Sequence, residues 1–338
     1  MVQSGKQGVV TIADVAERAK VSKTTVSHVL SGKRPVAAST RQRIEHVIEE
    51  LGFRPNTLAR NLRMQRTQMV ALIIPDITNP YYPMLARGLQ DALVEQGYHA
   101  FLCNTDGDKE QEIAFIADAV QRKVDGIIVS SLHERTQDLV EFIEEGVTFV
   151  SLGPCIEHPA VDRVSTDDQQ GALHATRYLI QHGHQRIGMI GGVPHLTPSK
   201  ERFAGYCKAL EEAHIPFYAT LFAEGDFMRA GGVRAMRKLM AQSELPTAIF
   251  CANDLMAIGA MDVARELGIR IPEDIAIVGY DDIEVASLVS PALTTVLNPG
   301  YDMGKTAGRL LLERLQGKYT GPGRHIVVPY RFIQRESA

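Results

Sequence analysis

Three short amphipathic segments follow one another in TIADVAERAKVSKTTVSHVLSGKRPVAASTRQRIEHVIEELG, residues 11–52. Thr11 is placed to begin a first helix, whose apolar stripe is Ile12, Val15, Ala16 and Ala19. Ser22 can cap a second helix that runs to Leu30, with an inner side formed by Val26, Val29 and Leu30. Only Lys20 and Val21 separate the two helices, so the chain must turn sharply between them.

A third helix follows. The spacing Ser39-x-x-Gln42 matches a capping box and predicts its start, and its apolar face is Ile44, Val47, Ile48 and Leu51. Helix, tight turn, helix and a supporting third helix form a helix-turn-helix, whose second helix enters the major groove of DNA. The outward side chains of that helix all offer hydrogen bonds, and none is acidic: Lys23, Thr24, Thr25, Ser27 and His28. A three-helix bundle that docks on another protein has the same outline.

The charge is divided unevenly along the chain, whose formal net charge is −4. Residues 1–66 hold 12 Lys/Arg against 5 Asp/Glu, whereas the remaining residues hold 24 against 35. A basic head on an acidic body localises attraction for a polyanion to one end. A solvated helical surface with chance basic residues would give the same distribution, so charge supports DNA binding without establishing it.

The composition of the 338 residues, 45% apolar and 22% charged, is typical of a globular protein. No run approaches the ~18 apolar residues of a membrane span, and the N-terminus lacks the pattern of an export signal. Four widely spaced cysteines form no CxxC pair (Cys103, Cys155, Cys207 and Cys251). We therefore expect a cytoplasmic protein with reduced thiols, no metal site, no cofactor and no membrane contact.

Apolar strands alternate with amphipathic helices from Met69 onward. The strands expected are Val70–Pro75, Ala100–Asn104, Gly126–Ser130, Phe149–Leu152, Val161–Ser165, Arg186–Ile190, Ala248–Cys251, Ile275–Gly279, Thr294–Leu297 and His325–Val328. Helices expected between them include Tyr82–Gln96, Lys109–Gln121, Asp168–His182 and Leu255–Leu267. This alternation predicts parallel sheets covered on both faces, with ligands near the carboxyl ends of the strands.

The head closely resembles that of the lactose-repressor (LacI/GalR) family over TIADVAERAKVSKTTVSHVLSGKRPVAASTRQRIEHVIEELGFRPNTLARNLR. The resemblance implies that Lys23, Thr24 and His28 read base edges. It also implies that residues 55–62 form a hinge helix in the minor groove, with Leu62 wedged between base steps. A linker whose Leu58 and Leu62 pack on the body is the alternative. The DNA contacts expected are Thr11, Ser22, Lys23, Thr24, Thr25, Ser27, His28, Asn56, Leu58, Ala59, Arg60 and Leu62.

The rest of the chain resembles the family's effector-binding body, which looks like a periplasmic sugar-binding protein. Its markers include IIPDITNPYYPMLARGL, GHQRIGMIGG and FCANDLMAIGA. The resemblance implies an all-α helix-turn-helix head (1–54), a hinge helix and linker (55–66), and a two-lobed α/β body for effector binding and dimerisation (67–338). The N-lobe is expected at about 67–165 plus 299–323, and the C-lobe at about 166–298 plus 324–338.

Asn79, Tyr81 and Tyr82 follow the first expected strand and are expected effector contacts. The resemblance implies that Arg202, Asn253 and Asp281 also contact the effector, because the family often uses these positions, and Asn298 is expected beside them. A helix cap or a turn is the alternative role for Asn253 and Asp281. For Arg202 the alternative is a surface salt bridge with Glu201 or Glu211. The resemblance thus implies a small polar effector, either a sugar or a purine-like molecule.

The effector is the least specified feature. The chain looks most similar to the ribose operon and purine repressors of the family. Those relatives carry an Asp and a Trp where this chain has Gly153 and Pro154, and the chain contains no Trp. Leu196 replaces an arginine that the purine repressor uses on its base. A pentose such as ribose is therefore the leading prediction.

No enzyme motif supports a catalytic function. Gly300-x-x-x-Gly304-Lys305-Thr306 lacks the first glycine of a phosphate-binding loop, and no GxGxxG follows the first strand. A secreted sugar-binding protein without DNA function and a chromatin-like protein remain alternatives. We expect a repressor that binds a palindromic operator as a homodimer, because two recognition helices one DNA turn apart read a palindrome.

Overall fold

The chain divides into two units, Met1–Thr67 and Gln68–Ala338, and each is described by itself. A computed structural model describes residues 10–31, 34–53, 66–133 and 136–338. The division falls one residue after the expected end of the linker. The expected hinge contacts lie outside the described residues: Asn56, Leu58, Ala59, Arg60 and Leu62.

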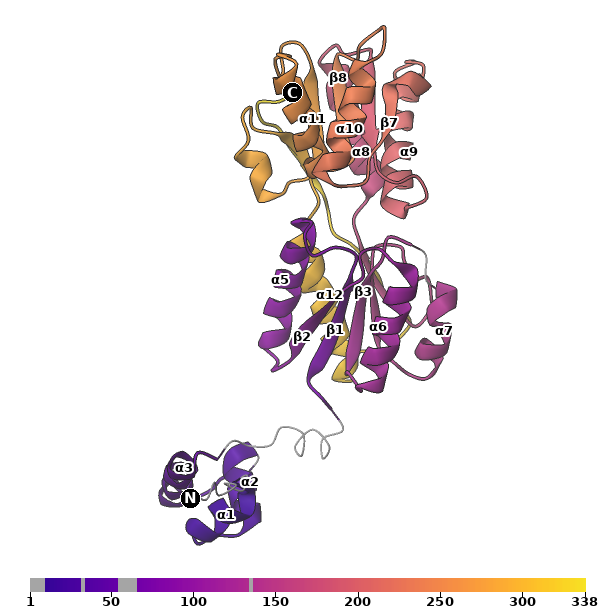
Figure 1. Cartoon of the computed structure of the whole chain (residues 1–338). Coiled ribbons are helices and arrows are strands. Elements are labelled where there is room, and N and C mark those ends of the chain that lie inside the picture. The colour runs from indigo at the N-terminus through magenta and orange to yellow at the C-terminus, as the bar shows by residue number, and fades with distance from the viewer. Residues whose placement is uncertain (1–9, 32–33, 54–65, 134–135) are drawn as a thin grey trace, which may run out of the picture. The chain divides into compact units, whose positions relative to one another are not determined.

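The head contains the three expected helices, α1 (Ile12–Arg18), α2 (Lys23–Ser31) and α3 (Ala38–Leu51) (Figure 1). Lys20 turns the chain between α1 and α2 with a positive φ of 52°. The core consists of Val15, Ala16, Ala19, Val26, Val29, Ile44, Val47 and Phe53. All of these except Phe53 belong to the predicted apolar faces, so the helix-turn-helix prediction is confirmed.

The predicted capping box at Ser39 and Gln42 is wrong. Helix α3 already begins at Ala38, so both residues lie inside it. The capping box of the head is at α1 instead, where the Asp14 carboxylate accepts bonds from the Thr11 amide (2.7 Å) and hydroxyl (2.8 Å). The helix could begin at either of two adjacent residues, Ala38 or Ser39, so the pattern Ser39-x-x-Gln42 alone did not identify its start.

The first lobe of the body is built on a parallel sheet in the order β11-β5-β4-β3-β1-β2. Its strands are β1 (Met69–Ile74), β2 (His99–Asn104), β3 (Gly126–Ser130), β4 (Phe149–Leu152), β5 (Asp162–Ser165) and β11 (His325–Val327). Helices α5 (Tyr81–Val94) and α12 (Gly300–Leu315) cover one face (Figure 1). The other face packs on α6 (Lys109–Gln121) and α7 (Thr136–Glu144).

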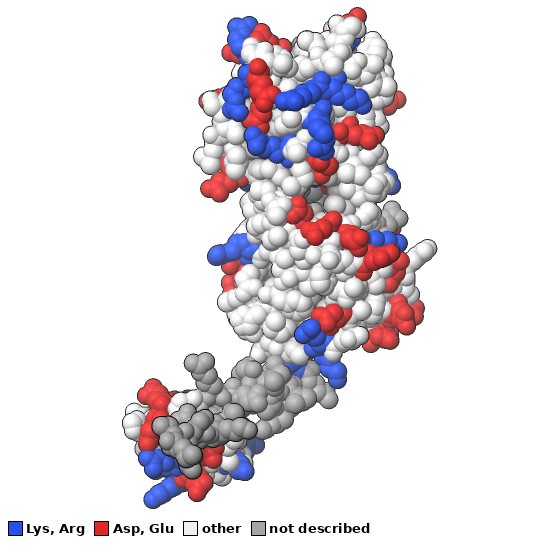
Figure 2. All heavy atoms as spheres, in the orientation of Figure 1, with Lys and Arg blue, Asp and Glu red and all other residues white. Residues whose placement is uncertain are grey.

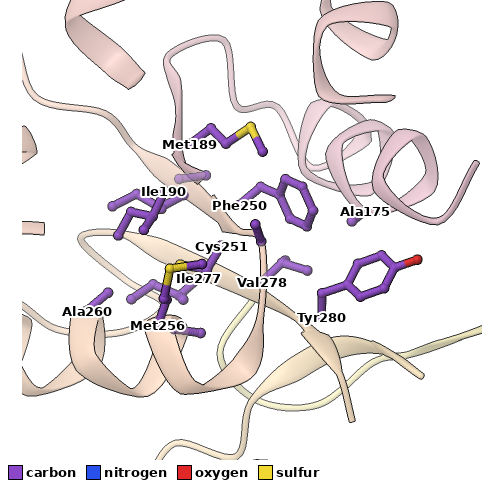
Figure 3. Close-up of a cluster of buried hydrophobic side chains, with 14 of the residues drawn as sticks. Ala175, Met189, Ile190, Phe250, Cys251, Met256, Ala260, Ile277, Val278 and Tyr280 are labelled. Carbon is purple, nitrogen blue, oxygen red and sulfur yellow. The ribbon is translucent and has the colours of Figure 1, made fainter. Parts of the chain in front are cut away.

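The second lobe repeats this arrangement with the order β12-β10-β9-β8-β6-β7. The strands are β6 (Ile187–Gly191), β7 (Phe222–Glu224), β8 (Ala248–Cys251), β9 (Ala276–Asp281), β10 (Thr294–Leu297) and β12 (Arg331–Ile333). Its helices are α8 (Asp168–Gln181), α9 (Thr197–Glu212), α10 (Arg229–Met240) and α11 (Asp254–Glu266). Figure 3 shows part of its core, where Phe250, Met256 and Ile277 lie among other apolar side chains.

Two details differ from the sequence-based expectations. Strand β12 pairs antiparallel with β10, so the second sheet is not purely parallel. Strand β11 pairs with β5 of the first lobe, so the chain returns to the second lobe after Val327 and the lobe boundary expected near residue 323 is wrong. The chain passes between lobes three times, after β5, β10 and β11. In the described part of the chain, no helix has the length and apolar character needed to cross a membrane.

Candidate functional site

A cavity of about 600 Å³ lies in the body, lined by residues from both lobes. Its wall includes the ends of several strands or the residues just after them: Pro75, Ser130, Leu152, Ser165, Val193, Asp281 and Asn298. The carboxyl ends of parallel strands are where such folds place ligands. The volume is within the range of small-molecule sites, roughly 300–1,000 Å³.

Arg202 is the central cation of the cavity. It projects from α9 and is only 5% exposed. Its Nε donates to the Asp168 carboxylate at 2.8 Å, and its Nη1 donates to the Ala252 carbonyl at 2.5 Å. The guanidinium also lies 3.8 Å from the centre of the Tyr280 ring. The surface salt bridge considered for Arg202 is therefore absent, because the side chain is buried among these groups.

Asp281 lies at the end of β9 in a strained turn, where it and Asp282 have positive φ angles of 112° and 54°. Its carboxylate is 3.6 Å from Nη2 of Arg202 and accepts a hydrogen bond from Nδ2 of Asn298 at 3.2 Å. Burial raises the pKa of Asp281 to about 6, although Arg202 and Asn298 oppose the shift. The turn thus brings a buried carboxyl group beside Arg202.

Buried Asp254 is hydrogen-bonded to the backbone just after this turn. Its two carboxylate oxygens accept bonds from the Ile283 amide at 2.9 Å and the Thr295 hydroxyl at 2.6 Å. Burial, with Asp281 nearby, raises the pKa of Asp254 well above its usual range. Asp254 does not line the cavity, so it acts on the site through the position of residues 281–283.

Two lining residues carry buried polar atoms without hydrogen-bond partners, Oδ1 of Asn298 and Oγ1 of Thr166. The orientation of the Asn298 amide follows from its contact, because only the NH2 group can donate to Asp281. Its oxygen is left as a free acceptor in a side chain that is 6% exposed. Buried polar atoms are normally paired, so these two atoms are available to a polar group bound in the cavity.

The aromatic wall comes from the start of α5. Tyr81 and Tyr82 meet edge to face with ring centres 5.2 Å apart, and both line the cavity. Asn79 also lines it and accepts a bond from the Tyr81 amide at 3.1 Å. The structure thus brings six of the seven expected effector residues to one cavity: Asn79, Tyr81, Tyr82, Arg202, Asp281 and Asn298.

Asn253 is the exception, because it does not line the cavity. Its Oδ1 accepts from the Met256 amide at 3.0 Å and caps α11, while its Nδ2 donates to the Phe227 carbonyl at 2.8 Å. Asn253 thus takes the helix-cap role that was its alternative. Phe227 is itself a lining residue, so Asn253 holds part of the wall in place.

Several lining residues were not identified from the sequence. Asp168 was expected only as a helix start, yet it pairs with Arg202. His133 and His195 stack with ring centres 5.7 Å apart, one from each lobe. Asp168 could have been found because it follows the end of β5, the same signal that identified Asp281. No sequence signal identified the histidines.

The head presents the polar face of α2. Ser22, Lys23 and Thr24 are exposed, whereas Thr25, Ser27 and His28 are partly buried. Ser22 Oγ accepts from the Thr25 amide at 3.1 Å and shares a hydrogen bond with the Thr25 hydroxyl at 2.8 Å, so it caps the helix. Thr11 is also an exposed capping residue. The exposed polar side chains leave donors and acceptors available to a groove.

Comparison with known proteins identifies both units. Residues 11–56 match the model for bacterial regulatory proteins of the lacI family, and residues 176–338 match the periplasmic binding protein-like domain. The HTH-type transcriptional repressor PurR of Pasteurella multocida (strain Pm70) is 38% identical over 312 residues. The alignment spans 91% of this chain and 92% of that protein.

Solved structures give the same result. The Lac repressor dimer bound to operator and the anti-inducer ONPF has a TM-score of 0.86 and 26% identity, covering 97% of this chain and 98% of that chain. A LacI family transcriptional regulator from Enterococcus faecium with bound ribose has a TM-score of 0.74 and 31% identity. That match covers 80% of this chain and 98% of the other.

Proposed function

Since the chain belongs to the lacI family of bacterial regulatory proteins and is a helix-turn-helix transcription repressor rather than an enzyme, we propose that a sugar bound in the body cavity controls its hold on a palindromic operator. The observation that carries this proposal is the cavity itself, with Arg202 and Asp281 buried in its wall. A secreted sugar-binding protein would share the body but would have no use for the basic head.

The DNA-binding half of the proposal rests on α2. Lys23, Thr24 and His28 are the side chains that we propose to meet base edges, while Thr11, Ser22, Thr25 and Ser27 contact the backbone or support the helix. Their chemistry suits this role, because α2 carries hydrogen-bonding groups and no carboxylate. The hinge contacts at residues 56–62 belong to the same proposal, in which a second copy supplies the other half-site.

A sugar is the effector class that the wall favours. Paired carboxylate, guanidinium and amide groups bind hydroxyls with strong discrimination, since a wrong ligand leaves buried groups unpaired. The face of a sugar ring also suits the aromatic pair Tyr81 and Tyr82. The purine alternative has less support, because Gly153 and Pro154 provide no stacking ring at their part of the wall. A pentose such as ribose remains our first candidate.

Operator binding by the full-length protein tests the proposal. Fluorescence anisotropy at fixed salt should show a clear preference for one palindromic operator over scrambled duplex, and ribose should change it. His28→Ala should lower the preference at one operator position by about 1–3 kcal/mol, whereas its affinity for scrambled DNA should stay close to wild type. An equal loss on every duplex would make His28 a phosphate contact.

A ligand screen tests the effector class separately. Thermal shifts with pentoses, hexoses, disaccharides and purine bases should single out a sugar, because a ligand of the folded body stabilises it by mass action. Stabilisation by a purine base alone, with no response to any sugar, would show that the effector is a purine. The proposed operator binding would not be affected by that result.

A further inference from the structure

The charges around the cavity are strongly unbalanced. Its described lining contains one Lys or Arg side chain, Arg202, together with the carboxylates of Asp76, Asp106, Asp168, Glu201, Asp226 and Asp281. Figure 2 shows carboxylate side chains gathered across the middle of the face that is drawn of the body. An anionic ligand would therefore enter a region of its own sign.

The positive charge of Arg202 is already paired with carboxylates of the protein. Its Nε and Nη1 are bonded to Asp168 and to the Ala252 carbonyl, and its Nη2 faces Asp281 at 3.6 Å. Although burial works against it, the two carboxylates raise the pKa of Arg202 above its ordinary value. The charge of Arg202 is thus already matched inside the protein, and a ligand phosphate would compete with both carboxylates.

Glu201 differs from the other acids of the wall. Asp76, Asp106, Asp168, Asp226 and Asp281 each accept a hydrogen bond from a neighbour: Thr78, Asn104, Arg202, Arg234 and Asn298 respectively. Within the described residues, the Glu201 side chain takes part in no hydrogen bond or ion pair, and it lines the cavity. Its free carboxyl group is thus available to a ligand.

Glu201 and Asn298 both present acceptor oxygens to the cavity. The Oδ1 atom of Asn298 is buried and unpartnered, as described above. Satisfying these acceptors requires a ligand with hydroxyl or amino hydrogens. A doubly ionised phosphate has acceptor oxygens only, so a phosphate group placed against either acceptor would leave it unpaired and add like-charge repulsion, whereas the hydroxyl that it replaces could donate.

We propose that this cavity selects effectors that are uncharged or cationic hydrogen-bond donors, that it rejects their phosphorylated forms, and that Glu201 is the residue that determines this selectivity. The inference rests on the proposed sugar effector and narrows it to free, unphosphorylated sugars. The regulator would therefore sense a sugar before a kinase acts on it.

Glu201 should also make the selectivity depend on pH. Burial raises its pKa to about 7; Asp168 and Asp167 add to the shift, whereas Arg202 and Arg163 oppose it. Above pH 7 Glu201 is ionised and repels a phosphate, and below pH 7 it becomes neutral. The preference for the free sugar should then rise as the pH increases through about 7.

The test compares ligand pairs on the full-length dimer by calorimetry between pH 6 and 8.5. The pairs are ribose with ribose 5-phosphate and glucose with glucose 6-phosphate; the neutral 5-O-methyl and 6-O-methyl ethers separate bulk from charge.

We expect one free sugar to bind on the order of 100-fold more tightly than its phosphate at pH 8. Glu201→Gln should reduce this ratio about tenfold and flatten its pH dependence. Glu211→Gln, which removes an exposed acid from the same helix, should leave the ratio unchanged.

The outcomes separate the two proposals. The phosphate's own titration is the same for both proteins, so the difference between wild type and Glu201→Gln isolates Glu201. A sugar phosphate that binds as tightly as its free sugar overturns the charge selectivity and leaves sugar control standing. If Glu201→Gln leaves the ratio of free-sugar to sugar-phosphate affinity unchanged, Glu201 does not determine the selectivity. If neither a member of these pairs nor any sugar of the thermal-shift screen binds while operator binding persists, the sugar effector is wrong and this inference falls with it.

Discussion

At the scale of single residues, the cavity separates side chains that contact a ligand from those that hold the wall. Asn253 follows β8 just as Asp281 ends β9, yet only Asp281 faces the cavity. The Asn253 side chain makes two hydrogen bonds within the protein, one with the Met256 amide and one with the Phe227 carbonyl. A polar residue after a strand is therefore a good pointer to the site but does not reveal which way its side chain turns.

Substitution of Asn253 tests this assignment. Asn253→Ala should lower the free energy of unfolding by about 1–2 kcal/mol, because a helix cap and a buried bond are lost. Asn253→Ser retains a capping oxygen and should recover part of that loss, as measured by denaturant unfolding. Effector affinity should fall less than tenfold in both variants. A loss beyond about a hundredfold in folded Asn253→Ser would return Asn253 to the direct contacts.

At the scale of elements, glycines allow the helices of each lobe to pack closely. Gly88 of α5 lies against the Tyr301 carbonyl of α12, and Gly304 of α12 lies against the Leu85 carbonyl of α5. In the second lobe, Gly232 of α10 and Gly259 of α11 meet the backbone of the opposite helix in the same reciprocal way. Gly304, which belonged to the incomplete phosphate-loop pattern, thus has a packing role.

Alanine at these glycines should destabilise the body. Gly304→Ala places a methyl group on the Leu85 carbonyl, and overpacking of this kind costs about 1–3 kcal/mol even after alanine's better helix propensity is included. Gly308→Ala is the matched control on the same helix, because its new methyl group meets mainly the side chains of Ala92 and Leu89, at 2.9 and 3.0 Å. The midpoint temperature of thermal unfolding should be lower for Gly304→Ala than for Gly308→Ala. Equal midpoints would argue against close packing of Gly304 on the Leu85 carbonyl.

At the scale of the whole molecule, the two units have opposite charge and different tasks. The head has an excess of Lys and Arg, whereas the body, including its cavity, has an excess of Asp and Glu. DNA binding by the head releases counterions, but binding of a neutral sugar by the body releases none. The two activities should therefore respond very differently to salt.

Raising the salt concentration from 50 to 200 mM should weaken operator binding by about a thousandfold, as expected for several phosphate contacts. Effector affinity, measured by calorimetry in the same buffers, should change less than about threefold. Lys23→Gln should make the salt dependence of operator binding less steep if Lys23 neutralises a phosphate. A steep salt dependence of effector binding would contradict the uncharged ligand.

The sequence by itself determined the elements and their class. Local periodicity identified the three head helices and most strands and helices of the body, because a face of apolar residues is a property of neighbouring residues. The position of polar residues after strands, together with the family resemblance, identified six of the cavity residues, including Arg202 and its partner Asp281. Boundaries such as the start of α3 were less certain, since two adjacent residues could begin the same helix.

Only the tertiary structure decided which of these side chains meet. Asp168 lies 34 residues from Arg202, and no local pattern relates the two. Strands from distant parts of the chain line up in two sheets, and this arrangement decides which side chains find partners. It leaves the Glu201 carboxyl and the Asn298 oxygen free, and it directs the Asn253 side chain to the Phe227 carbonyl. Side-chain direction and partner choice are set by that long-range packing, which periodicity does not encode.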